Sequence, residues 1–145
     1  MPRTPQAGAA PLSVALIVFD GAPALPCALV RAALAAAGPV AGGHVALRIV
    51  TLTGDAVTLD DGATVAPGAS LELAAAADLL LIVGPAGCPL PCPMALRGAL
   101  HAVRRRGGTL GGIDGGAALL AGLGVASGPL PRGARDHATG PGWLI

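Results

Sequence analysis

A glycine-rich stretch at residues 109–120, T-L-G-G-I-D-G-G-A-A-L-L, constrains the fold of this chain more than any other feature. Apolar residues among the first glycines are typical of a short strand, and the alanine and leucine run that follows favours a helix. Asp114 would lie on the sharp turn between them, where Gly112 and Gly116 remove side chains that would clash. This is the spacing of a nucleophile elbow, a strand-to-helix turn that presents a reactive side chain. Here the residue presented is an aspartate.

Before this stretch, apolar runs alternate with helical segments. The runs are rich in Val, Leu and Ile, as expected of strands buried on both faces of a parallel sheet. We predict strands at 13–19, 45–52 and 78–83, and helices or helical turns at 25–37, 71–76, 94–106 and 116–123. An Asp-Gly step at Asp61-Gly62, between 56–59 and 64–66, predicts a hairpin.

The first predicted helix carries Leu29, Ala32, Ala33 and Ala36 at helical spacing, and Gly38-Pro39 is expected to stop it. Pro93 is expected to open the helix at 94–106, since proline is tolerated in a first helical turn.

Alternating strands and helices indicate an α/β fold, a mainly parallel sheet flanked by helices. Ligands of such sheets bind at the carboxyl ends of the strands. The turns expected to converge there are Asp20-Gly21, Gly84-Pro85 and Asp114-Gly115. Our candidate ligand-binding residues are therefore Asp20, Gly84, Asp114 and Gly115.

Length and composition suit one folded domain. The chain has 145 residues, of which 53% are hydrophobic and 12% charged, which excludes general disorder. We predict a flexible lead-in at 1–12, the α/β domain at 13–125, and an irregular Gly/Pro-rich tail at 126–145.

Charge and hydropathy exclude several classes of partner. A net charge of +1 gives no extended field for nucleic acid or an anionic membrane. The run Arg104-Arg105-Arg106 ends a predicted helix, where cations offset the helix dipole; phosphate contacts are the alternative interpretation. No apolar run reaches the roughly 18 residues of a membrane span, and the N-terminus lacks a signal-peptide pattern. We expect a cytoplasmic protein with no membrane contact and no direct nucleic acid contact.

The sequence also predicts no metal site and no cofactor. Cys27, Cys88 and Cys92 cannot all pair, and the last two lack the second ligand pair of a zinc site, so we expect reduced, structural thiols. His44 and His101 are expected in a loop and on a helix face rather than as ligands.

Five segments, taken in order, carry a family resemblance. They are V-A-L-I-V-F-D-G at 14–21, L-V-R-A-A at 29–33, D-G-A-T-V-A-P at 61–67, A-D-L-L-L-I-V-G at 77–84 and L-G-G-I-D-G-G-A-A-L-L-A-G-L-G at 110–124. With them the chain resembles the class I glutamine amidotransferase-like superfamily that includes the PfpI-type proteins. Within it, the chain is most similar to the N-terminal sensor domain of AraC-type, GlxA-like transcriptional regulators. The resemblance covers about 13–125 and implies a flavodoxin-like, amidotransferase-like domain.

The resemblance also implies a lost active site. Enzymes of the superfamily use an elbow Cys, aided by a nearby His and a Glu from the first helix. Here Asp114 is at the elbow, Gly115 replaces the His, and Ala28 stands about where the Glu would fall. Thiolate catalysis needs such a set, so we expect no enzyme. The family's regulators continue into a helix-turn-helix region; this chain ends soon after the elbow helix, which implies a C-terminal truncation or a separate DNA reader.

The leading hypothesis is a non-catalytic sensor domain of an AraC-type regulator, binding a small polar metabolite beside Asp114. The resemblance implies a homodimer, and the G-I-D turn resembles that of regulators with quaternary ammonium ligands, with amino-acid-like ligands as another class. Against an aromatic cage for such ligands, the aromatic side chains are only Phe19 and Trp143.

Alternatives stay open at each point. Asp114 could cap the following helix, and Asp20 could be only a turn former. The chain could be a PfpI-like hydrolase or hydratase, with Cys88 or Cys92 replacing the elbow thiol. It could also be a truncated remnant without activity, against which a cooperative melting transition would argue.

Overall fold

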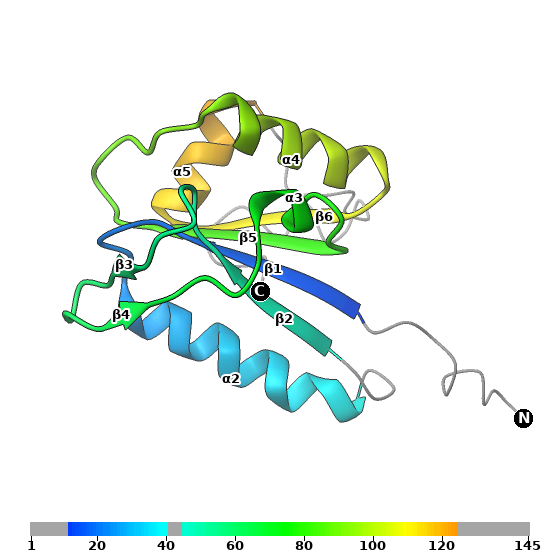
Figure 1. The fold of residues 1–145 in the computed structure, drawn as a ribbon, viewed down its shortest axis with the longest axis horizontal. Coiled ribbons are helices and arrows are strands. Elements are labelled where there is room, and N and C mark those ends of the chain that lie inside the picture. Colours follow the sequence, from blue (N-terminus) through cyan, green and yellow to red (C-terminus); the bar gives the residue numbers. More distant parts are fainter. Residues whose placement is uncertain (1–11, 41–44, 125–145) are drawn as a thin grey trace, which may run out of the picture.

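Four of the apolar runs pair into one parallel sheet with the strand order β2-β1-β5-β6 (Figure 1). The computed structural model describes residues 12–40 and 45–124. In it β1 (Leu12–Val18) lies between β2 (Val45–Val50) and β5 (Leu79–Gly84), and β5 pairs with β6 (Thr109–Asp114). This confirms the predicted α/β fold with a mainly parallel sheet. The predicted lead-in, apart from Leu12, and the predicted tail lie outside the described residues.

Helices cover both faces of this sheet (Figure 1). One face is covered by α2 (Ala24–Val40), together with a small hairpin of β3 (Val57–Thr58) and β4 (Thr64–Val65). The other face is covered by α3 (Leu71–Ala74), α4 (Met94–Arg105) and α5 (Gly115–Gly122). Among the described residues, no helix is long and apolar enough to cross a membrane.

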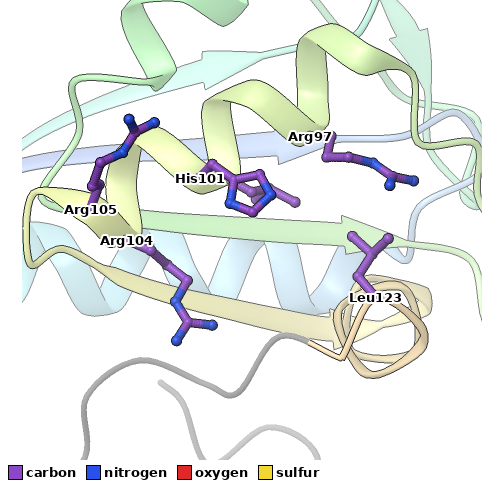
Figure 2. Close-up of a pocket in the computed structure, with 6 residues that line it drawn as sticks. Arg97, His101, Arg104, Arg105 and Leu123 are labelled. Atoms are coloured by element: carbon purple, nitrogen blue, oxygen red, sulfur yellow. The ribbon is translucent and has the colours of Figure 1, made fainter.

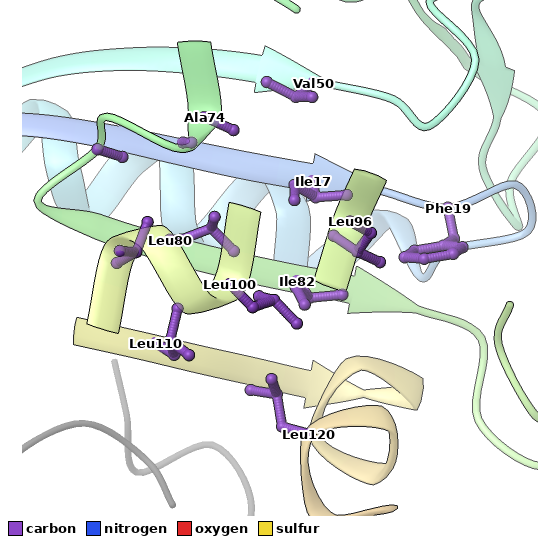
Figure 3. Close-up of a cluster of buried hydrophobic side chains, with 13 residues drawn as sticks. Ile17, Phe19, Val50, Ala74, Leu80, Ile82, Leu96, Leu100, Leu110 and Leu120 are labelled. Atoms are coloured by element: carbon purple, nitrogen blue, oxygen red, sulfur yellow. The ribbon is translucent and has the colours of Figure 1, made fainter. Parts of the chain in front are cut away.

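Burial on both faces explains why the strands are continuous apolar runs. Along β1, Val14, Leu16 and Val18 point toward α2, whereas Ala15 and Ile17 point toward the layer of α4 and α5. Because successive side chains of a strand alternate between faces, a strand with a helix layer on each side needs apolar residues at every position. Figure 3 shows the cluster on the α4 side, in which side chains from the sheet meet those from the helices above it.

The hairpin is tied to the start of α2. The predicted hairpin is confirmed: Gly62 has a positive φ of +89°, and the Leu59 N–H donates to the Ala63 carbonyl at 2.7 Å. The Asp60 carboxylate accepts a hydrogen bond of 2.9 Å from the Ala24 N–H, the first residue of α2. A side chain from the hairpin therefore satisfies one of the free N–H groups at that helix terminus.

Helix α2 differs from its prediction in length. It runs to Val40 and includes Gly38-Pro39, where it was expected to stop. Proline lacks an N–H and so removes one helical hydrogen bond. In the last turn of a helix that single loss does not prevent helical backbone geometry, and the helix ends one residue after the proline.

The buried face of α2 is not the one that the apolar spacing indicated. Cys27 and Val30 are buried against the sheet, whereas Leu29 is 58% exposed. The other residues of the predicted stripe, Ala32, Ala33 and Ala36, are exposed as well. Alanine and leucine residues occur on all sides of this helix, so their spacing alone could not identify the buried face. The homodimer stays a prediction, and the exposed apolar residues of α2 are candidates for its interface.

Candidate functional site

The backbone at Asp114 has the conformation of a nucleophile elbow. Its φ is 53° and its ψ is −116°, and it is the only non-glycine residue with positive φ in the described part of the chain. Asp114 ends β6, and α5 begins at the next residue. A non-glycine residue in such a sparsely populated region costs about 1–3 kcal/mol and persists only where the surroundings enforce it.

Three glycines enforce that turn through close backbone contacts. A Cβ on Gly112 would overlap the Gly116–Ala117 peptide, and one on Gly115 would overlap the Pro85 carbonyl oxygen. A Cβ on Gly116 would overlap the Ile82 carbonyl oxygen of β5. The elbow is therefore pressed directly onto the end of β5. The glycine spacing in the sequence reflects this contact.

The Asp114 side chain is exposed and makes no capping hydrogen bond with α5. Asp114 holds the N-cap position of α5, but the side-chain hydrogen bond that the capping interpretation expects is absent. A side chain that caps a helix starts from extended backbone, from which its oxygen reaches the N–H groups of the first turn. At φ 53° the side chain of Asp114 leaves the turn in another direction, and its carboxylate is presented to solvent.

A cleft of about 510 Å³ opens at the same, carboxyl edge of the sheet. Its walls come from the segments that follow β1, β2 and β5, and most of the lining is apolar. The polar side chains that line it are Asp20, Thr53 and Cys88. A mostly apolar cleft with a few polar groups, at the carboxyl ends of parallel strands, has the properties of a small-molecule site.

Asp20 lines this cleft and also holds the hairpin. One of its carboxylate oxygens, Oδ1, accepts a hydrogen bond of 2.9 Å from the Thr58 N–H, and the neighbouring Gly21 N–H donates to the Thr58 carbonyl at 2.7 Å. The turn role and the cleft role therefore coexist. The side chain is exposed, and Oδ2 has no hydrogen-bond partner among the described residues.

The other predicted site residues lie beside the cleft rather than in its lining. Gly84 is paired with Asp114 in the sheet register, and a Cβ on Gly84 would lie 2.6 Å from Leu90 Cδ1, a cleft residue. Gly115 is packed on Pro85, which also lines the cleft. The four residues thus lie at one edge of the sheet. Asp114 ends β6 and Asp20 is in the turn after β1, and these two strands are separated by β5, or roughly 10 Å.

The three free thiols lie in three different environments. Cys27 lies on the buried face of α2, and burial raises the pKa of its thiol; Arg31 lowers and Asp60 raises that pKa to smaller extents. Cys92 is half-buried and packs against the core. Cys88 is exposed and lines the cleft, so the expectation of a purely structural thiol is wrong for this residue.

Sequence reasoning missed Thr53 as a cleft residue, and it considered Cys88 only for the hydrolase alternative. The available signal was the position of each after a buried strand at the carboxyl edge. Of the predicted histidines, His101 lies exposed on α4, and His44 is outside the described residues. Ala28 is exposed on α2. Within the described ranges, no group of three or more His, Cys, Asp or Glu residues could hold a metal ion.

Solved structures share this fold. DJ-1beta from Drosophila melanogaster has a TM-score of 0.63 at 22% identity, over 79% of this chain and 61% of that one. An AraC family transcriptional regulator from Pseudomonas putida has a TM-score of 0.67 at 25% identity, over 79% of this chain and 71% of that one. The DJ-1 superfamily protein Atu0886 from Agrobacterium tumefaciens has a TM-score of 0.60 at 27% identity, over 77% and 58%.

These similarities confirm the resemblance to the DJ-1/PfpI superfamily and to an AraC family regulator within it. The matched part of this chain spans less than two thirds of the length of the Drosophila protein. No family model matches the sequence, and no match is found among curated proteins.

Proposed function

We propose that this chain is a non-catalytic, small-molecule-sensing domain of an AraC-type transcriptional regulator, and that its ligand binds at the carboxyl edge of the sheet. The observation that carries this proposal is the elbow itself. Its strained backbone and its glycine contacts are intact, yet the side chain that it presents is the Asp114 carboxylate. The fold similarity to an AraC family regulator supports the regulatory context.

The side chains around the elbow support the proposed absence of catalysis. Covalent catalysis requires a nucleophile within hydrogen-bond reach of a base. Gly115 follows Asp114 directly, and Ala28 on α2 provides no carboxylate. None of the histidines of the described segments lines the cleft, since His101 lies on α4.

The cleft favours a ligand with an apolar body and a positively charged or N–H-bearing head group. Asp20 contributes a carboxylate with one oxygen free of described partners, and Thr53 adds a hydroxyl. Phe19 is the only aromatic residue in the described ranges and is only 6% exposed, so these residues provide no aromatic cage. Among quaternary ammonium and amino-acid-like metabolites, this favours head groups that donate hydrogen bonds to Asp20.

A thermal-shift screen against betaine, carnitine, amino acids and polyamines tests the proposal, because a ligand that binds only the folded state raises the melting temperature. We expect a shift that is lost in Asp20→Asn and reduced in Asp114→Ala. Glu72→Gln removes one negative charge from exposed α3 and should keep the shift, which controls for net charge. A shift of the same size in Asp114→Ala would exclude Asp114 from the site.

A second candidate function rests on the position of Cys88. This exposed thiol lines the cleft together with Asp20, so a PfpI-like hydrolase could use it in place of the missing elbow thiol. Turnover of ester or amide substrates that is abolished in Cys88→Ser and unaffected in Cys92→Ser would support this function. Absence of turnover in the parent protein would exclude the hydrolase, and the sensor would be the one remaining proposal.

A further inference from the structure

A second cleft, of about 340 Å³, lies between α4 and the end of α5 and shares no lining residue with the first cleft. Figure 2 shows its lining, which comes from α4 and from Leu123 at the end of α5. Four of the six lining residues are basic, and none is acidic. The complete lining is Arg97, Leu100, His101, Arg104, Arg105 and Leu123.

The helix dipole accounts for only part of this basic lining. Arg104 and Arg105 are in the last turn of α4, where cations are stabilised by the negative end of the dipole. Arg97 is in the first turn, where the same dipole disfavours a cation. Arg97, His101 and Arg104 are spaced by four and three residues, so they follow one another along one side of the helix (Figure 2). The helix dipole therefore does not explain why basic residues follow one another along the whole of this side of α4.

The neighbouring Arg106 shows what an arginine with a structural role looks like here. Its guanidinium donates to the Ala75 and Ala77 carbonyls at 3.1 and 3.2 Å and lies 3.9 Å from the Asp78 carboxylate. Arg97, Arg104 and Arg105 have no side-chain hydrogen bond or ion pair with any described residue. The run Arg104-Arg105-Arg106 thus divides into one structural arginine and two that face solvent.

We propose that the α4 cleft binds a small ligand carrying several phosphate groups. Guanidinium groups bind phosphate oxygens through paired N–H donors, and this geometry favours arginine at phosphate sites. Arg97 and Arg104 lie seven residues apart, about 10 Å along the helix, and a short chain of phosphates spans such a separation. Buried Leu100 forms an apolar floor between the two arginines.

The cleft fits a small oligophosphate better than a nucleic acid. Its volume is within the range of small-molecule sites. With a net charge of +1 the chain lacks the extended positive surface that a nucleic acid backbone requires. The sequence after residue 124 carries Arg132 and Arg135 against the single acid Asp136, so it does not supply an anionic segment that would neutralise the cleft.

Isothermal titration of the full chain with sodium tripolyphosphate tests this proposal. We expect binding at low ionic strength that is strongly reduced in 1 M NaCl, where screening extends to about 3 Å. Each of Arg97→Gln and Arg104→Gln should weaken binding about fivefold, and the double variant more. Arg48→Gln, which removes one exposed charge from β2, should bind as the parent does.

Three results would overturn the proposal. One is the absence of binding by a parent chain that melts cooperatively. Another is equal affinity in the parent and in the Arg97→Gln, Arg104→Gln double variant, provided that both melt alike. The third is tighter binding of a 20-base-pair DNA duplex than of tripolyphosphate at 0.15 M salt, lost in the same variants, which would identify a nucleic-acid surface instead.

Discussion

The elbow and the cleft beside it lie at the same edge of the sheet and differ in how they are built. The elbow is closed, because backbone atoms of Pro85 and of Ile82 in β5 leave no room for a Cβ at Gly115 and Gly116, respectively. The cleft is open and is lined by loop residues, among them Asp20 and Cys88. Elbow geometry is thus maintained by packing, independently of the chemistry that the turn presents, whereas the functional groups available to a ligand belong to the loops.

The largest effect is expected where the elbow is tightest. Gly116→Ala would drive a Cβ into the Ile82 carbonyl oxygen, which should cost about 3 kcal/mol or more in the free energy of unfolding. Gly122→Ala, in the same helix but with no atom within 4 Å of the new Cβ, should instead stabilise by about 0.5–1 kcal/mol. Urea denaturation of both variants measures the difference, and similar stabilities would show that the elbow is not rigidly packed.

A smaller effect is expected at the cleft. Asp20→Ala removes the acceptor for the Thr58 N–H and should destabilise by about 1 kcal/mol. Asp20→Asn retains an acceptor oxygen and should keep most of that stability while losing the negative charge. The two variants, compared by urea denaturation, therefore separate the structural role of Asp20 from its ligand role. An Asn variant as unstable as the Ala variant would show that the charge itself holds the hairpin.

Relief of backbone strain at the elbow should be measurable but modest. Asp114→Gly places the residue that best tolerates φ 53° at the turn and should raise stability by about 0.5 kcal/mol, after the greater chain entropy of glycine is included. Asp114→Val, which is β-branched, should lower it. A melting temperature that is lower for the Gly variant than for the Val variant would mean that the Asp114 side chain stabilises the turn.

The smallest effect concerns the thiol of Cys27 on the buried face of α2. Burial raises the pKa of Cys27 above its ordinary value of 9.0, so the unfolded chain loses this proton at lower pH than the folded one. The thiol's contribution to stability is complete below about pH 9 and is lost as pH rises through the folded-state pKa. The parent should therefore lose more unfolding free energy between pH 8 and pH 10 than Cys27→Ala does. Equal losses would indicate that Cys27 is not buried in solution.

The elbow could be predicted from the sequence because its determinants are local. Gly112, Asp114 and Gly116 lie within five residues, and the contact that requires Gly112 is with the Gly116–Ala117 peptide of the same strand-turn-helix unit. The contact of Gly116 with the Ile82 carbonyl of β5 is tertiary, and the sequence spacing did not reveal its partner. The hairpin was predictable for the same reason, since an Asp-Gly step sets its turn. The parallel strands were also predictable, because strands buried on both faces are continuous apolar runs in the sequence.

The sequence predicted that Asp20 and Pro85 lie at the carboxyl edge, but the full lining of the cleft could not be predicted because its residues come from distant parts of the chain. Asp20, Thr53 and Cys88 meet only after three strands have paired in the order 2-1-5, and no spacing in the sequence encodes that order. The prediction of the buried face of α2 was wrong because alanine and leucine occur on all sides of that helix. Likewise, Arg106 differs from Arg104 only through tertiary contacts with residues 75–78.

The central claim is that the edge of the sheet binds a ligand through the cleft and not through catalysis at the elbow. Calorimetric titration of the best ligand from the screen, into the parent and into Asp20→Asn, tests it most directly. The account predicts binding to the parent, no turnover of the ligand, and affinity at least about tenfold lower in Asp20→Asn. Unchanged affinity in Asp20→Asn, or chemical conversion of the ligand during the titration, would contradict it.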